Sequence, residues 1–188
     1  MKDLINFFFE IGMLKHAKRS GWWLINVKDP ENIAEHSFRT AVISYFLAKL
    51  EKVNPEKVAL MCLFHDLHES RVNDLHKVGQ RYINFKEAER KASKEQTEFL
   101  GDAGRDIFEL NEEFQNQETK ESLVAKDADY VEVSVQAKEY LEMGYKDAQN
   151  WIDNCKKCVK TKSAKKLLDL IEKTSSNDWW RTLKKIQR

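Results

Sequence analysis

The sequence predicts an all-α fold, and three features lead to that prediction. Only six glycines and two prolines interrupt 188 residues, so few positions break a helix. Apolar residues recur at three- and four-residue spacing almost throughout, which is the period of a helix with one buried face. We find no convincing strand. Hydrophobic residues make up 41% of the chain, enough for one packed core, so we expect a single domain over residues 1–188.

The first part of the chain divides into three expected helices around one irregular segment. Helices are expected over residues 1–18 and 34–52, and the glycine- and proline-containing segment 19–32 between them is expected to be irregular. The third helix begins with Asn54 as its cap and Pro55 at its first position, a favoured start. The apolar positions at helical spacing are Leu4, Phe7, Phe8, Ile11 and Leu14 in the first helix, Phe38, Val42, Tyr45 and Phe46 in the second, and Val58, Met61, Cys62 and Phe64 in the third.

The second part of the chain is also helical. We expect a loop after the third helix, and Gly144 in the position that commonly ends a long helix. The last two helices are expected to pack on a core formed by residues 15–143. The expected helices cover residues 86–99, 105–115, 118–143, 145–160 and 163–185.

Charge and cysteine content narrow the class of protein. Lys and Arg (32) nearly balance Asp and Glu (31), so nothing indicates a nucleic acid or an anionic membrane as a partner. No run approaches the ~18 apolar residues of a membrane span, and the N-terminus lacks the pattern of a signal peptide. Cys155 and Cys158 form one CxxC without a second pair, which favours a structural role over a metal or redox site. We expect a soluble, cytoplasmic protein.

The sequence FHDLHES ends the third expected helix with polar residues where an apolar face should continue. His65 and Asp66 project about 100° apart, so both can reach one point between their directions. An isolated pair of this kind would more often face solvent. However, His36 lies in the first turn of a helix beside residues expected to be buried, and Asp127 and Asp129 lie mid-helix among apolar residues, where unpaired acids are costly. On these grounds a metal site and a purely structural role are evenly balanced.

These segments resemble the HD-domain superfamily of metal-dependent phosphohydrolases. The matching pieces are RSGWW, NVKDPENIAEHSFR, ALMCLFHDLHES, Asn73-Asp74 and KDADYVEV, which lie within residues 15–143. The chain is most similar to the 5′-deoxynucleotidase branch, which includes the bacterial YfbR type and the eukaryotic HD-domain-containing protein 2 type. After the His-Asp pair that branch has a Glu and then Gly-Asp, whereas this chain has Glu69 and then Asn73-Asp74.

The resemblance implies a role for each matching residue. Glu69 would act on the attacking water, with Asp74 also catalytic and close to a sugar hydroxyl. Arg19 and Trp22 would lie near the phosphate and the sugar of a nucleotide substrate. One divalent metal would be held by His36, His65, Asp66 and Asp129, a ligand set that suits Mn, Co, Fe or Zn better than Ca or Mg. The resemblance also implies a homodimer.

We therefore predict a 5′-nucleotidase that hydrolyses deoxyribonucleoside 5′-monophosphates to nucleoside and phosphate. Two alternatives remain. One is another HD-type hydrolase that acts on a deoxynucleoside triphosphate or a phosphodiester. The other is a helical module that binds metal or nucleotide without turnover, and Glu69 argues against it because binding alone needs no base.

Two choices within the site remain open on periodicity alone. Asp127 and Asp129 differ by about 200° around one helix, so at most one can face a metal. Bulkier apolar neighbours surround Asp127, but the family spacing from Lys126 and the smaller neighbours of Asp129 favour Asp129. His68 either faces solvent or supports the ligands from behind.

Overall fold

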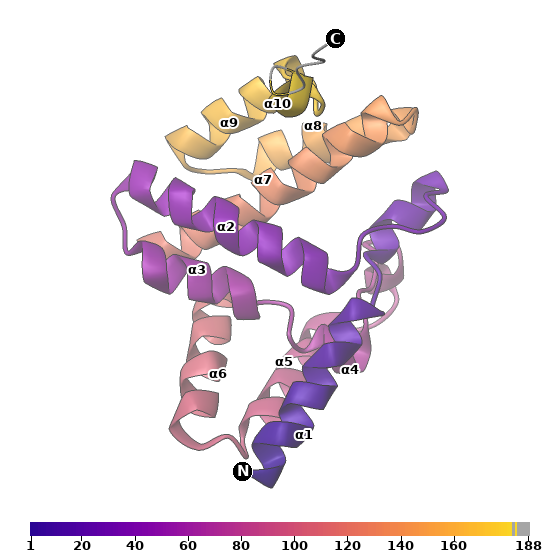
Figure 1. Ribbon diagram of the computed structural model, residues 1–188. Coiled ribbons are helices and arrows are strands. Elements are labelled where there is room, and N and C mark those ends of the chain that lie inside the picture. The colour runs from indigo at the N-terminus through magenta and orange to yellow at the C-terminus, as the bar shows by residue number, and fades with distance from the viewer. Residues whose placement is uncertain (182, 184–188) are drawn as a thin grey trace.

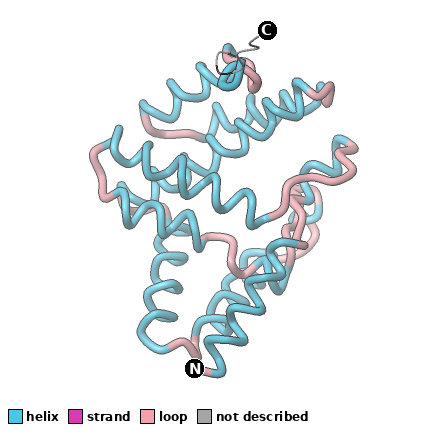
Figure 2. Tube along the Cα trace, in the orientation of Figure 1, coloured by secondary structure: helices cyan, strands magenta, loops and turns pink. Residues whose placement is uncertain are grey.

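The computed structural model describes residues 1–181 and 183, and over these residues the all-α prediction is confirmed (Figures 1 and 2). The described residues contain no strand, only an isolated bridge between Lys18 and Asn32. The α-helices are α1 (Lys2–Ile11), α2 (Ile33–Glu51), α3 (Pro55–Phe64), α4 (Glu69–Val72), α5 (Phe85–Thr97), α6 (Gly101–Asn116), α7 (Lys120–Glu142), α8 (Gln149–Cys158), α9 (Lys162–Lys173) and α10 (Asp178–Arg181). Short 3-10 helices cover Gly12–Lys15, Ser20–Ile25, Gly79–Arg81 and Lys146–Ala148.

Helix α7 lies at the centre of the fold. Helices α2, α3, α6, α8 and α9 all pack against it (Figure 1). More than half of its residues are buried, including Asp127, Asp129 and Glu132. A helix surrounded on so many sides has no solvent face for these acids, so each must find a partner in the interior. The long helix expected over 118–143 is confirmed, and Gly144 follows it with the positive φ of +105° expected of a helix-ending glycine.

The segment with the His-Asp pair forms a turn between two helices. The predicted start of α3 is confirmed, because Asn54 Oδ1 accepts a hydrogen bond from the Lys57 amide at 3.0 Å. The expectation that one helix continues through residues 64–70 is wrong. Helix α3 ends at Phe64, and α4 begins at Glu69, whose amide donates to Asp66 O at 3.0 Å. The turn points its side chains towards the first turn of α2 and the middle of α7.

The apolar face of α2 differs from the expectation. Phe38 and Phe46 are 68% and 64% exposed, and the residues that α2 buries include His36, Thr40 and Ser44. Small polar side chains on the inner face let α2 approach α3 and α7 closely, and the large apolar side chains therefore point outward. The first expected helix also differs, since α1 ends at Ile11 and a 3-10 turn continues the chain to Lys15.

The C-terminal helices pack on α7 as expected. Ile152 of α8 and Leu168 of α9 are fully buried in the main core. The single helix expected over 163–185 is interrupted, because Thr174 is extended (φ −104°, ψ 131°) and ends α9. The end of that expected helix, at 182 and beyond 183, lies outside the described residues.

The sequence also predicts a structural role for the cysteines and no membrane-spanning segment. Cys62, Cys155 and Cys158 are free thiols, and none belongs to a possible metal-binding group found among the described residues. None of the helices described combines the length and the apolar character needed to cross a membrane. The cytoplasmic location stays a prediction.

Candidate active site

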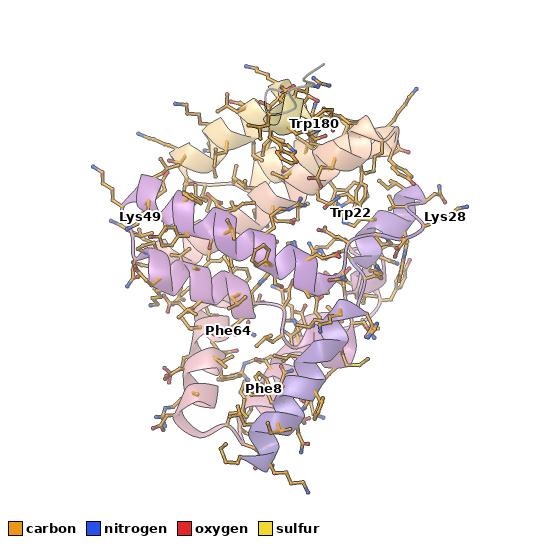
Figure 3. All side chains as sticks on the ribbon, in the orientation of Figure 1. Phe8, Trp22, Lys28, Lys49, Phe64 and Trp180 are labelled. Carbon is orange, nitrogen blue, oxygen red and sulfur yellow. The ribbon has the colours of Figure 1, made fainter. Side chains whose placement is uncertain are left out.

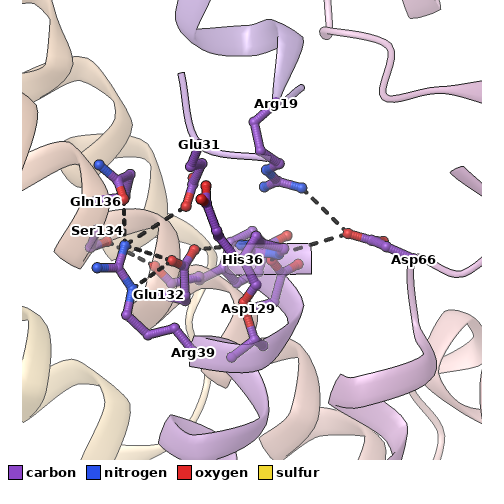
Figure 4. Close-up of polar contacts among 12 residues, drawn as sticks. Arg19, Glu31, His36, Arg39, Asp66, Asp129, Glu132, Ser134 and Gln136 are labelled. Atoms are coloured by element: carbon purple, nitrogen blue, oxygen red, sulfur yellow. Dashed lines mark hydrogen bonds and ion pairs between the residues drawn. The ribbon is translucent and has the colours of Figure 1, made fainter. Parts of the chain in front are cut away.

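His36 of α2 and His65 of the turn after α3 both direct their Nε2 atoms into the protein interior. Figure 4 shows His36. His36 Nδ1 lies 2.5 Å from Glu132 Oε2, and His65 Nδ1 lies 2.7 Å from the carbonyl oxygen of Cys62. Carbonyl and carboxylate oxygens only accept hydrogen bonds, so each Nδ1 carries the proton and Nε2 of the neutral ring keeps its lone pair. Both Nε2 atoms are buried, and neither has a hydrogen-bond partner among the residues that the structure describes. A metal ion satisfies buried lone pairs of this kind.

Two carboxylates complete this group. Asp66 Oδ2 lies 3.1 Å from His65 Nε2 and 3.7 Å from His36 Nε2. The ligand atoms of His36, His65 and Asp66 all lie within 4.8 Å of one another. Asp129 joins them through His36, with its Oδ1 3.3 Å from His36 Nε2. The residues expected to bind the metal therefore fit a divalent cation, in donor type as well as in position.

The contacts of Asp127 and Asp129 separate their roles. Asp127 accepts hydrogen bonds from the amides of Lys160 and Thr161, the shortest at 2.7 Å, and so holds the connection between α8 and α9. Asp129 faces His36 and also accepts from Lys126 Nζ at 2.9 Å. This geometry favours Asp129 as the fourth ligand.

The electrostatics of the group favour a cation. Burial and Arg19 act to lower the pKa of His36, but Glu132 and Asp129 outweigh them and raise it to about 10. Burial acts to raise the pKa of Asp66, yet His65 and Arg19 hold it below its ordinary value. Lys126 and His36 likewise keep the pKa of Asp129 well below its ordinary value against the effect of burial. The carboxyl groups of Asp66 and Asp129 are therefore ionised, and they stabilise a positive charge held by this group.

A buried network behind His36 was not found from the sequence. Glu132, with no exposed surface, contacts His36 and accepts a hydrogen bond from Arg39 Nε at 2.8 Å. Arg39 in turn donates to Glu139 at 3.0 Å. It also donates to Gln136 at 2.6 Å (Figure 4). The only sequence signal is spacing, since Glu132 lies three residues after Asp129 and Arg39 three residues after His36.

Three of the four residues expected to act on substrate, Arg19, Glu69 and Asp74, lie beside the metal-binding group. Arg19 Nη1 is 3.5 Å from Asp66 Oδ2, and the amide of Ser20 donates to Asp74 Oδ2 at 2.5 Å, which joins the two loops. Glu69 is buried, and no described residue forms a hydrogen bond with its Oε2 atom. Burial and the neighbouring Asp66 and Asp74 raise the pKa of Glu69 well above its ordinary value. Buried carboxyl groups with a raised pKa are typical of residues that transfer protons in active sites.

Asn73 stands where the 5′-deoxynucleotidase branch has a glycine, and its backbone has a conformation that glycine favours. Asn73 has φ +58° and ψ 169°, in the half of conformational space that glycine favours. Residues with a Cβ atom rarely adopt this combination of φ and ψ, so the surrounding structure holds Asn73 in it. The chain therefore turns after α4 and brings Asp74 back to Ser20.

Trp22, labelled in Figure 3, belongs to the main hydrophobic core. Its side chain is 2% exposed, stacked on Trp151 with ring centroids 5.1 Å apart, and in edge contact with Tyr140. Its indole N–H donates to Glu31 Oε1 at 3.0 Å. This burial does not support the expected substrate contact, and it indicates a role in fixing Glu31 near the network behind His36.

Fold and site together define an all-α protein with a buried His, His-Asp and Asp centre. The HD domain family model matches residues 11–171, and the chain belongs to this family. The chain is 35% identical to "5′-deoxynucleotidase HDDC2" of Dictyostelium discoideum, over 74% of this chain and 78% of that protein. It is 31% identical to the human protein of the same name, over 77% and 72% of the two chains. A solved structure of the PH0347 protein from Pyrococcus horikoshii superposes with a TM-score of 0.77 at 27% identity, covering 90% of this chain and 98% of that one.

Proposed function

We propose that this protein is a metal-dependent 5′-deoxynucleotidase, which hydrolyses deoxyribonucleoside 5′-monophosphates to deoxynucleoside and phosphate. The observation that carries the proposal is the pair of unpartnered Nε2 atoms of His36 and His65, which converge with Asp66 beside Arg19. The relatives named 5′-deoxynucleotidase, which match about three quarters of the chain, support the substrate class.

Each residue has a role in this reaction that follows from its chemistry. A divalent transition metal held by His36, His65, Asp66 and Asp129 would neutralise phosphate charge and lower the pKa of water. The guanidinium of Arg19 binds non-bridging phosphate oxygens. Glu69 accepts the proton of the attacking water and returns it to the 5′-oxygen as the P–O5′ bond breaks.

The sugar end of the substrate is assigned to Asp74. One of its carboxylate oxygens is held by the Ser20 amide, which fixes the side chain and leaves the other oxygen for a sugar hydroxyl. We expect deoxynucleotides to be better substrates than the matching ribonucleotides, and 3′-monophosphates to be left intact. Equal rates on AMP and dAMP would remove this assignment.

A phosphate-release assay on metal-stripped protein tests the proposal. Nucleoside mono-, di- and triphosphates and a cyclic nucleotide are each supplied with Mn, Co, Fe, Zn or Mg. We expect release from deoxynucleoside 5′-monophosphates, with Mn or Co better than Mg. Preference for a triphosphate or cyclic substrate would favour the other HD-type hydrolases, and nucleotide binding without any turnover would favour a binding module.

We also propose that a second copy of the chain covers the outer face of α2, giving a homodimer. This α2 apolar face consists of Phe38, Val42, Tyr45 and Phe46, which are between 38% and 68% exposed and follow helical spacing. Exposed apolar side chains gathered on one helix are typical of an interface. Light scattering should give a dimer mass for the native chain and a monomer mass for Phe46→Asp. Lys28→Asp, on a loop away from α2 (Figure 3), is the matched control and should stay dimeric.

A further inference from the structure

After the metal ligands are assigned, three buried polar atoms on the turn between α3 and α4 have no hydrogen-bond partner in the described part of the chain. They are Oε2 of Glu69 and both ring nitrogens of His68. His68 is 2% exposed and Glu69 is 4% exposed, so bulk water does not satisfy these atoms. An imidazole buried with neither nitrogen bonded is costly unless a ligand or an ion completes it.

These atoms meet at Asp66. Asp66, His68 and Glu69 each offer one ligand atom, and the three atoms lie within 4.8 Å of one another. Asp66 also belongs to the group formed with His36 and His65. A carboxylate has two oxygens, and in two-metal sites it can contact both ions. The turn between α3 and α4 therefore supplies a second set of ligands next to the first.

The outer side of His68 has the surroundings of a metal-binding histidine. Glu89 Oε1 of α5 lies 3.6 Å from His68 Nε2, too far for a hydrogen bond but close enough to become one after a small shift of either side chain. A carboxylate at this position orients a metal-binding imidazole. A cavity of about 200 Å³ is lined in part by His68, Glu89, Ser93 and Asn111, so this side of the ring is not tightly packed.

We propose that Asp66, His68 and Glu69 form a second divalent-metal site, weaker than the first, and that its occupation inhibits the enzyme. It is weaker because it contains one imidazole, shares Asp66, and lies near Arg19, whose Nη1 is 3.5 Å from Asp66 Oδ2. Zn and Co suit this mixed donor set better than Mg. Inhibition rests on the proposed function: a Glu69 carboxylate bound to an ion cannot accept the proton of water.

Metal stoichiometry tests the site without reference to activity. Metal-stripped protein is titrated with Zn, and bound ions per chain are counted by equilibrium dialysis and native mass spectrometry. We expect two ions for the native chain and one for His68→Ala, with His68→Leu as a second variant that fills the ring's volume without a ligand. His16→Ala, at an exposed histidine, should keep two. One ion in the native chain, or two in both His68 variants, would overturn the proposal.

Turnover at increasing Zn or Co tests the inhibition. The native chain should gain activity with the first ion and lose on the order of 10²-fold with the second, the scale of an acid–base group. In His68→Leu, activity should rise to a plateau and stay there. Two bound ions with a plateau in the native chain would overturn inhibition alone. Two bound ions with no turnover on any nucleotide would instead contradict the proposed function.

Discussion

Replacing Glu132 by Gln should weaken metal binding through His36 without removing any ligand. The Glu132 carboxylate accepts from His36 Nδ1, so that the neutral ring, which is the form that binds a metal, has its lone pair on Nε2, facing the metal position. An amide in its place can donate to Nδ1 through its NH₂ group, which would move the ring proton to Nε2 and block coordination. Its oxygen accepts a neutral hydrogen bond only, weaker than the charge-assisted one.

The expected magnitude follows from the surroundings of Glu132. Losing the partner that orients a metal-binding histidine costs about 10- to 100-fold in metal affinity, or about 1.4–2.7 kcal/mol. The fold should survive, because Arg39 keeps its bonds to Glu139 at 3.0 Å and Gln136 at 2.6 Å. Competition with a chromophoric chelator measures the dissociation constant for Co or Mn at the first site.

Glu139→Gln is the matched control. Glu139 lies on the same helix and binds the same arginine, but the contacts of His36 do not include it. Its metal affinity should stay within about twofold of the native value, a shift of less than about 0.5 kcal/mol. Native affinity in Glu132→Gln, or an equal loss in both variants, would refute the reasoning that orientation of His36 determines metal affinity.

Further predictions concern the other buried carboxyls and Asn73. Asp129→Asn should lose the first metal, whereas Asp127→Asn should keep the metal and unfold at a lower temperature. Metal analysis and calorimetry measure these two effects. Loss of metal in Asp127→Asn alone would show that Asp127, not Asp129, is the fourth ligand. Glu69→Gln should keep the first metal and lose on the order of 10²-fold in turnover, and an unchanged rate would make Glu69 a structural acid. Asn73→Gly should raise the melting temperature, since glycine adopts φ +58° without strain. A lower melting temperature would show that the Asn side chain stabilises the fold by more than its backbone strain costs. Metal binding at neutral pH should release protons, because the pKa of metal-free His36 is raised to about 10. Calorimetry in buffers of different ionisation enthalpy measures the number of protons released. No release would contradict the protonated state of metal-free His36.

The sequence predicts the helices better than it predicts which of their faces are buried. Caps and breakers act locally, so the start of α3 at Asn54 and the end of α7 before Gly144 follow from neighbouring residues alone. Burial depends on what packs against a helix. The apolar stripe of α2 that contains Phe38 and Phe46 has the pattern of a core face, and nothing local shows that a polar face with His36 and Thr40 is the inner one.

The site shows the same division between local and long-range information. Family spacing favours Asp129 as the fourth ligand, which stays a prediction. The structure is consistent with it, because Asp127 accepts hydrogen bonds from the amides of Lys160 and Thr161. The sequence does not reveal the roles of Glu132 and Glu31, because their partners, His36 and Trp22, lie on other elements. The resemblance implies that Trp22 lies at the substrate, but nothing in the sequence shows that the Trp151 ring stacks on it.

The charge balance of the interior explains why the fold accepts so many buried acids. Five carboxyl groups, of Glu31, Asp66, Glu69, Asp129 and Glu132, are buried around the centre. The basic side chains in contact with them are Arg19, Arg39 and Lys126, which leaves an excess of about two negative charges when all groups are ionised. Without a metal, protons reduce this excess: burial and Glu132 raise the pKa of Glu31 to about 7, and the pKa values of Glu69 and His36 are raised as well. A divalent cation supplies the same two charges at one point. The buried acids are therefore stabilised when the ion is bound, and the ligands need not be neutral to remain in the core.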